Sequence, residues 1–264
     1  MDESNLSLKE ENRKLRKILK ETKDELRSVS DRLNTIDRQK DEFISMAAHE
    51  LRAPTTAIKG YLSMMLNGDA GDISERVRGY LADAQATNDR LIRLVNNMIN
   101  VSRIEEGKIT YQIDDVKLSA LAGAVYSDFK FEAERKKLGF STEIQENVND
   151  LVKVDPDRIR EVVANMVSNA IKYTNEGFVK IKVLDSSGGM VRLEVVDSGP
   201  GISEEEQSKI FRKFYRVKSA VGKTIGTGLG LYISKLIIKS FDGEIGVDSR
   251  MGSGSTFWFE LPRQ

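Results

Sequence analysis

Residues 43–54 read FISMAAHELRAP, and this stretch decides how the rest of the chain is interpreted. It contains His49, the only histidine among the 264 residues. Apolar side chains recur around it at helical spacing, at Ala47, Leu51, Pro54, Ile58, Tyr61 and Met65. Successive helical residues turn by about 100°, so His49 lies opposite the centre of that stripe. The pattern predicts a helix that presents the imidazole to solvent. It should bend or loosen just after the histidine, because Pro54 has no backbone N–H to donate.

Composition limits the classes of protein to which the chain can belong. Lys and Arg together number 41, and so do Asp and Glu, so no net field attracts nucleic acid or an anionic membrane. The absence of cysteine excludes disulfides and thiolate chemistry, and a single histidine excludes a multi-histidine metal site. No apolar run approaches the ~18 residues that span a bilayer, and the start MDESN is unlike a signal peptide. We therefore expect a soluble cytoplasmic chain with no membrane span and no nucleic-acid partner.

Residues 5–43 fit a heptad repeat that contains neither Pro nor Gly. One seam position holds Asn5, Asn12, Leu19, Leu26, Leu33 and Lys40, and the other holds Leu8, Leu15, Thr22, Val29, Ile36 and Phe43. Repetition every 3.5 residues predicts a coiled coil, and asparagine in the first of these positions favours a parallel dimer. Glu11 would then meet Arg16 of the other chain, and Arg32 would meet Asp37. A monomeric helix is the alternative, but its apolar seam would lie in water.

A helical hairpin is expected to follow. The helical pattern continues to about Leu66, and NGDAGDIS at 67–74 is typical of a turn in which Asp72 or Ser74 caps the next helix. A second amphipathic helix should run from about Glu75 to Arg103. In a parallel dimer, two such antiparallel hairpins close into a four-helix bundle.

The pattern changes to mixed α and β from about residue 109. Predicted strands are TYQI (110–113), FSTEI (140–144), FVKIKVL (178–184), MVRLEVVD (190–197), GEIGVDS (243–249) and STFWFEL (255–261). Predicted helices lie near 117–136, 156–173 and 229–241. Since strands and helices do not alternate strictly, an α+β two-layer sandwich with helices on one face fits better than a doubly wound sheet.

The predicted helix 156–173 carries a polar face. Glu161, Asn165, Asn169 and Tyr173 are spaced four residues apart and so share one side of the helix. Two successive amides that face a cleft suggest ligation of a hydrated Mg²⁺ through oxygen. Ordinary surface asparagines are the alternative.

Two glycine-containing motifs follow this helix. VVDSGPGI at 195–202 places Asp197 at the end of an apolar strand, where a carboxylate can accept the amino hydrogen of adenine but repels the oxygen of guanine. An ordinary strand-to-turn aspartate is the alternative. GTGLGL at 226–231 opens a predicted helix, whose backbone N–H groups can cradle phosphates because glycine permits close approach.

The connection between these motifs has the features of a lid. Residues 203–228 are long for a loop and rich in charge and glycine. Within them, IFRKFYRV at 210–217 offers Phe211 and Phe214 as apolar anchors. The cations expected within reach of phosphate oxygens are Arg212, Arg216 and Lys223, for which a solvated surface is the alternative.

Taken in order, these motifs resemble those of sensor histidine kinases of two-component systems, over essentially all of residues 40–264. HELRAP resembles the phosphoacceptor box of that family, and ANMVSNAIKYT (164–174) its asparagine box. DSGPGI and GTGLGL are similar to the two glycine boxes, IFRKFYR to the phenylalanine box, and GSGSTFWFELP (252–262) to the last pair of strands. Each motif alone is weakly specific, but six in the family's order are strongly so.

The resemblance implies three domains: a coiled-coil signalling linker at 1–42, a dimerisation and histidine phosphotransfer domain at 43–107, and a catalytic ATP-binding domain of the Bergerat fold at 108–264. It implies that His49 takes the γ-phosphoryl group of ATP and passes it to an aspartate in the receiver domain of a response regulator. Glu50 matches the acidic neighbour that accepts or orients the imidazole proton.

The resemblance also implies the cofactor sites. Asn169 would bind Mg²⁺ with Asn165 beside it, Asp197 would hold adenine, and Lys172 and Tyr173 would line the nucleotide. The remaining positions implied to contact ATP are Gly199, Gly201, Ile202, Arg216, Gly226, Thr227, Gly228, Leu229 and Gly230.

One position departs from the family pattern. Many of these kinases carry Thr or Asn four residues after the histidine, where the side chain is thought to position the water that dephosphorylates the regulator. Here Ala53 stands at that place, so we expect weak phosphatase activity. Two other functions remain open from the sequence: a Bergerat ATPase that hydrolyses ATP to drive conformational closure, and a coiled-coil scaffold without catalysis.

Overall fold

The computed structural model describes residues 3–217 and 227–264. In the first helix it describes the side chains of residues 13–17, 19–20, 22–32, 35–36, 39, 44 and 46 onward. The chain divides into two compact units, Met1–Val95 and Asn96–Gln264. Within the described residues, no helix combines the length and apolar content that crossing a bilayer requires.

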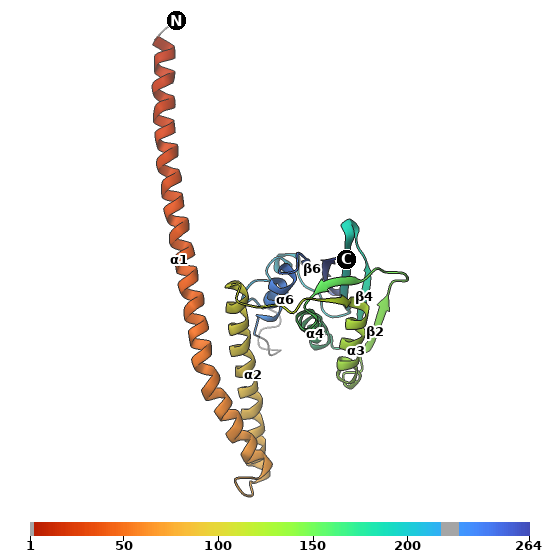
Figure 1. Cartoon of the computed structure of the whole chain (residues 1–264). Helices are drawn as coiled ribbons and strands as arrows, with labels where there is room; N and C mark the ends of the chain where they lie inside the picture. The colour runs from red at the N-terminus through yellow and green to blue at the C-terminus, as the bar shows by residue number, and fades with distance from the viewer. Residues whose placement is uncertain (1–2, 218–226) are drawn as a thin grey trace. The chain divides into compact units, whose positions relative to one another are not determined.

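The first unit is helical. It contains α1 (Glu3–Asn67) and most of α2 (Glu75–Glu105), drawn in red to yellow in Figure 1. Ser74 Oγ accepts a hydrogen bond from Val77 N at 3.4 Å, which confirms that Ser74 can cap the second helix. The helices are joined by polar contacts, above all the buried Asn88 Nδ2, which donates to the carbonyl of Thr55 at 2.8 Å.

Pro54 lies inside α1 and does not end it. The hydroxyl of Thr55 donates to the carbonyl of Leu51 at 2.7 Å, and the hydroxyl of Thr56 donates to that of Arg52 at 2.8 Å. Such side-chain bonds to the preceding turn satisfy carbonyls close to the proline and accompany bending in helices. Figure 1 shows α1 as one gently curved helix.

The second unit is built on a five-stranded mixed sheet with strand order β2-β4-β5-β7-β6. Its strands are β2 (Gly139–Ile144), β4 (Phe178–Asp185), β5 (Met190–Asp197), β7 (Gly254–Pro262) and β6 (Glu244–Arg250). Only β2 and β4 pair in parallel. The main helices are α3 (Leu118–Arg135), α4 (Pro156–Tyr173) and α6 (Gly230–Lys239), with the short α5 (Glu204–Gln207) and 3₁₀ turn η1 (Ser187–Gly189) between strands. The predicted succession of a helical region and an α/β sheet domain is confirmed.

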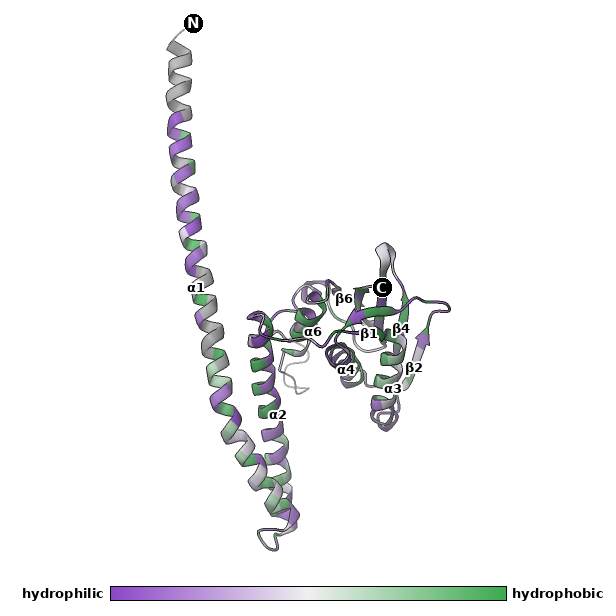
Figure 2. Cartoon of the chain, in the orientation of Figure 1, coloured by the Kyte–Doolittle hydropathy of each residue, from purple (hydrophilic) through white to green (hydrophobic). Residues whose placement is uncertain are grey.

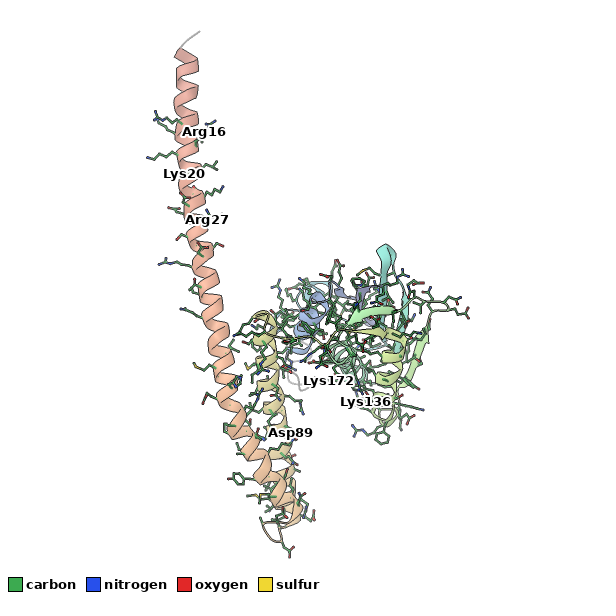
Figure 3. The ribbon with its side chains drawn as sticks, viewed as in Figure 1. Arg16, Lys20, Arg27, Asp89, Lys136 and Lys172 are labelled. Carbon is green, nitrogen blue, oxygen red and sulfur yellow. The ribbon has the colours of Figure 1, made fainter. Side chains whose placement is uncertain are left out.

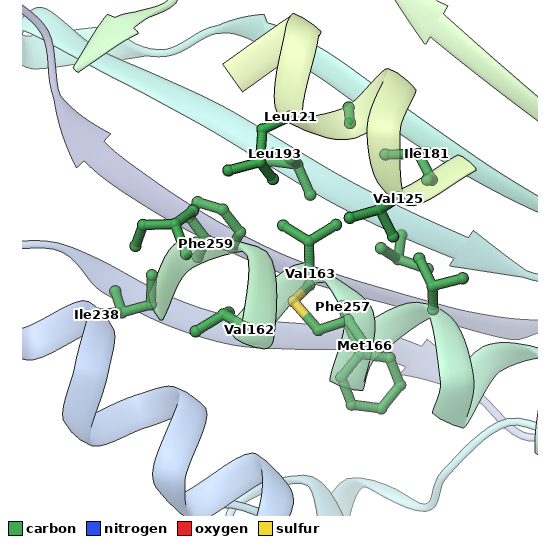
Figure 4. Close-up of a cluster of buried hydrophobic side chains, with 14 of the residues drawn as sticks. Leu121, Val125, Val162, Val163, Met166, Ile181, Leu193, Ile238, Phe257 and Phe259 are labelled. Carbon is green, nitrogen blue, oxygen red and sulfur yellow. The ribbon is translucent and has the colours of Figure 1, made fainter. Parts of the chain in front are cut away.

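One face of the sheet packs against the helices to form the core. Alternate β5 residues Val191, Leu193 and Val195 are buried, and the next residue in this series is Asp197. Opposite them α4 buries the apolar face that includes Val163 and Met166 (Figure 4). Because side chains alternate along a strand, this register directs Asp197 to the helix side of the sheet, beside the end of the core.

One predicted strand was wrong, and one strand was missed. TYQI (110–113) is not a strand; the strand is β1 (Asp114–Lys117), which pairs antiparallel with β3 (Leu151–Val154), a strand the sequence analysis did not predict. TYQI is instead fixed through individual contacts. The ring of Tyr111 meets that of Phe241 edge-on at 5.0 Å, and Gln112 N donates to Asp155 at 2.9 Å.

Candidate functional site

His49 and Glu50 are exposed on α1, whereas the preceding Ala48 is fully buried. The predicted exposure of the histidine is therefore confirmed for the single chain. Adjacent residues on a helix diverge by about 100°, so Glu50 does not share the face of His49. Ala53, one turn later, is also exposed and offers no hydrogen-bonding side chain.

Asp197 is buried at the end of β5. Burial raises the pKa of its carboxyl group above the ordinary value, and hydrogen bonds from the backbone N–H groups of Gly199 and Ser255 partly oppose that rise. The Gly199 bond to Asp197 Oδ1 is 2.8 Å long. A Cβ on Gly199 would stand 2.7 Å from the same oxygen, so glycine keeps space open in front of the carboxylate.

The C-terminal end of α4 carries two of the residues implied to line the nucleotide. Lys172 and Tyr173 are half-buried, and the Lys172 ammonium lies 4.8 Å from the centre of the Tyr173 ring. Lys136, labelled with Lys172 in Figure 3, donates to the carbonyls of Ile171 (2.7 Å), Lys172 (3.0 Å) and Thr174 (3.1 Å). A cation at a helix C-terminus stabilises both the free carbonyls and the helix dipole. The sequence analysis missed Lys136, because it lies 35 residues or more before its partners.

The two asparagines of α4 are in different surroundings. Asn165 Nδ2 donates to Ser234 Oγ of α6 at 3.0 Å. A Cβ on Gly230 would clash with Oδ1 of Asn165, so glycine at residue 230 leaves room for the Asn165 amide in its present position. Asn165 thus joins two helices. Asn169, one turn further along, is half-buried.

The described part of the second glycine motif forms the entry to α6. Gly228 has a φ of +71°, and a Cβ there would lie 2.8 Å from the carbonyl oxygen of Tyr215. Thr227 Oγ1 accepts a hydrogen bond from Leu229 N at 3.2 Å, and Leu229 is fully buried. The motif therefore packs against the IFRKFYRV segment. Gly226 lies outside the described residues, as does Lys223.

The first glycine motif packs against β6. Gly201 has a φ of +71°, and a Cβ there would lie 2.1 Å from the carbonyl oxygen of Arg250. Ile202 N donates to Ser249 Oγ at 2.8 Å, and the Ile202 side chain packs against the core. These contacts fix the segment that leaves β5 after Asp197.

Of the two phenylalanines predicted to anchor the IFRKFYRV segment, one packs against the core and the other does not. Phe211 packs against the core, but Phe214 is 44% exposed and has a φ of +63°, so the prediction for Phe214 was wrong. Arg216 is half-buried and Arg212 is exposed. Lys213 instead makes a 2.9 Å ion pair with Glu105.

Comparison with known proteins agrees with this arrangement. Residues 39–107 match the His Kinase A (phospho-acceptor) domain, and residues 154–264 match the histidine kinase-, DNA gyrase B- and HSP90-like ATPase family. The circadian input-output histidine kinase CikA of Synechococcus elongatus is 32% identical over 228 residues, which cover 85% of this chain and 30% of CikA. The structure of full-length ShkA in complex with AMPPNP has a TM-score of 0.71 at 27% identity, over 84% of this chain and 46% of ShkA.

A second solved structure covers both domains. Histidine kinase ThkA in complex with the response regulator protein TrrA has a TM-score of 0.59 at 30% identity, over 84% of this chain and 61% of ThkA. The chain carries both domains of one family in its characteristic order, and it belongs to the sensor histidine kinases. It spans less than a third of the length of CikA.

Proposed function

We propose that the chain is the cytoplasmic kinase part of a two-component sensor: it binds ATP, transfers the γ-phosphoryl group to His49, and passes that group to an aspartate of a response regulator. The observation that carries the proposal is the exposure of the single histidine on a helix whose residues match the phosphoacceptor family. Exposure matters because two other protein domains must reach the same ring in turn.

The second unit supplies groups that fit ATP. Asp197 accepts hydrogen bonds and suits the amino group of adenine, and Gly199 leaves space in front of it. The entry to α6 combines glycines with the N-terminus of a helix, which favours phosphate. Arg216, Lys172 and Tyr173 line the same site in this proposal, as do Gly201, Ile202, Gly226, Thr227, Gly228, Leu229 and Gly230. The AMPPNP bound by ShkA supports a nucleotide site of this kind.

Magnesium fits the donor set as a metal held jointly by protein and nucleotide. No group of three or more His, Cys, Asp or Glu side chains that could hold a metal occurs in the described part of the chain. Mg²⁺ commonly takes one or two protein oxygens and completes its octahedron with phosphate and water. We assign the protein ligand to the amide oxygen of Asn169, with Asn165 beside it. The metal would neutralise charge on the phosphates.

The chemistry asks little of the protein beyond alignment. A neutral imidazole has an unprotonated ring nitrogen that can attack the γ-phosphorus. The N–P bond forms, the bond to the bridging oxygen of ADP breaks, and the ring proton leaves. Glu50 accepts or orients that proton through an extended rotamer, because it does not share the face of His49. The phosphoryl group then moves to a regulator carboxylate, a partner supported by the ThkA–TrrA complex.

Dimerisation is proposed from exposed apolar surface. Seam residues Leu15, Leu19, Leu26, Val29 and Ile36 are each more than half exposed in the single chain. In Figure 2 the coloured residues of this part of the α1 ribbon are mostly hydrophilic, with green apolar positions between them. In the hairpin, large apolar side chains such as Leu51, Ile58, Tyr61 and Tyr80 are also exposed. A parallel coiled coil followed by a four-helix bundle would bury both sets. Of the proposed interchain pairs, the side chains of Glu11 and Asp37 lie outside the described residues.

The full chain incubated with γ-labelled ATP tests this proposal. We expect label on the protein that is acid-labile and base-stable, and complete loss of it in His49→Gln, with Glu146→Gln on an exposed loop as a control that stays labelled. Steady release of phosphate without bound label would identify an ATPase instead. Absence of both would identify a scaffold.

Ala53 leads to a separate prediction about the phosphatase reaction. An alanine cannot hold the water that attacks an aspartyl phosphate, so wild type should remove phosphate from its regulator slowly. Ala53→Thr should accelerate that loss by roughly tenfold or more, within the range of a well-placed catalytic group, while autophosphorylation persists. The measurement is the decay of labelled regulator with time. No acceleration in Ala53→Thr would contradict the prediction.

A further inference from the structure

Thr174 is an anomaly at the end of α4. Its side chain is 0% exposed, yet its hydroxyl has no hydrogen-bond partner among the described residues. Most buried polar groups in proteins are paired, because leaving one unpaired costs free energy. An unpaired hydroxyl next to a binding site is therefore a candidate contact for the ligand.

The Thr174 hydroxyl lies near the carboxylate of Asp197, the group proposed to bind adenine. The point where a Cβ would stand on Gly199 is 2.7 Å from Asp197 Oδ1 and 3.3 Å from Thr174 Oγ1. The two polar atoms thus border the same space, which glycine leaves open. One is a carboxylate that accepts hydrogen bonds, and the other is a hydroxyl that can donate.

The backbone of Thr174 is fixed on both sides. Its N–H donates to the carbonyl of Ala170 at 3.0 Å, and its own carbonyl accepts a hydrogen bond from Lys136 Nζ at 3.1 Å. Threonine is also restricted about its first side-chain torsion by branching at Cβ. The hydroxyl is consequently held beside Asp197 in the protein without nucleotide.

We propose that Thr174 is a specificity-determining residue, and this proposal rests on the ATP site described above. Its hydroxyl donates a hydrogen bond to N1 of adenine, directly or through one water. The neighbouring amino group of adenine donates to Asp197. Adenine presents a donor and an acceptor side by side on this edge, which complements the acceptor and donor of the protein. Guanine presents the reverse order, an oxygen and an N–H, so its oxygen meets the carboxylate.

Calorimetric titration of the full chain with ATP and Mg²⁺ tests the assignment. Thr174→Val removes the hydroxyl at constant shape and should weaken ATP binding by roughly three- to tenfold. It should leave GTP binding unchanged and raise the melting temperature of the nucleotide-free protein, because an unpaired buried hydroxyl is gone. Thr174→Ser should bind ATP like wild type. Thr142→Val, on the exposed strand β2, is the matched control and should change neither property.

A nucleotide analogue tests the same contact without altering the protein. Wild type should bind 1-deaza-ATP, which lacks the N1 acceptor, roughly three- to tenfold more weakly than ATP, and Thr174→Val should bind the two equally. The analogue 7-deaza-ATP keeps N1 and should bind wild type like ATP. Equal binding of ATP and 1-deaza-ATP by wild type would overturn the role of Thr174 while leaving the ATP site intact. A wild type that binds no ATP would overturn the proposed function itself.

Discussion

Asp197→Asn should remove most of the affinity for ATP. A hydrogen bond to a charged group contributes about 1.5–3 kcal/mol, so we expect the dissociation constant to rise roughly 10- to 150-fold. The amide cannot restore the contact, because the N–H groups of Gly199 and Ser255 both point at the present carboxylate. Whichever carboxylate oxygen the NH₂ group of asparagine replaced, its N–H groups would face either one of these backbone N–H groups or the amino group of adenine. Titration with ATP and Mg²⁺ measures the effect.

The control for this variant is Asp248→Asn. Asp248 lies on β6, which β7 separates from β5 in the sheet. Its side chain is 71% exposed, and its carboxylate pairs with Arg192. An exposed pair of this kind contributes little, so its loss should leave ATP binding near that of wild type. Equal affinities of wild type and Asp197→Asn for ATP would show that Asp197 does not bind adenine.

The raised pKa of Asp197 adds a pH dependence with a definite sign. The folded protein without nucleotide holds the proton at a higher pH than the unfolded chain does, so the contribution of Asp197 to stability falls as pH rises through that interval. ATP binds the ionised form better. Wild type should therefore bind ATP more tightly than Asp197→Asn by the full factor above the raised pKa of Asp197, and this factor should shrink as pH falls through that pKa. Comparing the two proteins at each pH cancels the titration of the phosphates. If the ratio of the two dissociation constants for ATP stayed constant from neutral to acidic pH, the assignment of Asp197 to adenine would be contradicted.

Alternation along the chain was enough to predict most of the fold. The residues of β5 alternate strictly, so the position of Asp197 on the core side follows from its register alone. β1 and β3 are four residues each, which is too short for alternation to identify them, and they form by pairing with each other. TYQI has strand-forming residues, but side-chain contacts to distant segments decide its conformation.

The sequence identified the motifs of the candidate site but not the residues that hold them together. Asn165 was selected as a ligand from helical spacing, whereas its bond to Ser234 depends on a helix 69 residues later. From the sequence, Thr174 was only the last residue of the motif ANMVSNAIKYT. The structure shows that its hydroxyl is buried without a hydrogen-bond partner among the described residues. Such contacts depend on distances between elements, which no local pattern contains.

Charge placed in the proposed coiled-coil seam should dissociate the dimer. Leu19 and Leu26 are 71% and 70% exposed in the single chain, and burying a leucine contributes about 1.5–3 kcal/mol. The double variant Leu19→Lys/Leu26→Lys replaces two seam leucines in each chain of the dimer. It also places like charges opposite each other across the seam. We expect the dimer dissociation constant to rise by at least about a hundredfold, measured by sedimentation equilibrium.

The matched control changes charge at the same levels of the helix but away from the seam. Lys20 and Arg27, labelled in Figure 3, each follow one of the two leucines by a single residue and are exposed. Lys20→Gln/Arg27→Gln should leave the dissociation constant near that of wild type, because an outer heptad position makes no contact across the seam. If both double variants behave alike, the exposed leucines do not form the interface. Dimerisation would then have to rest on the hairpin helices, where apolar side chains such as Leu51, Ile58 and Tyr61 are also exposed.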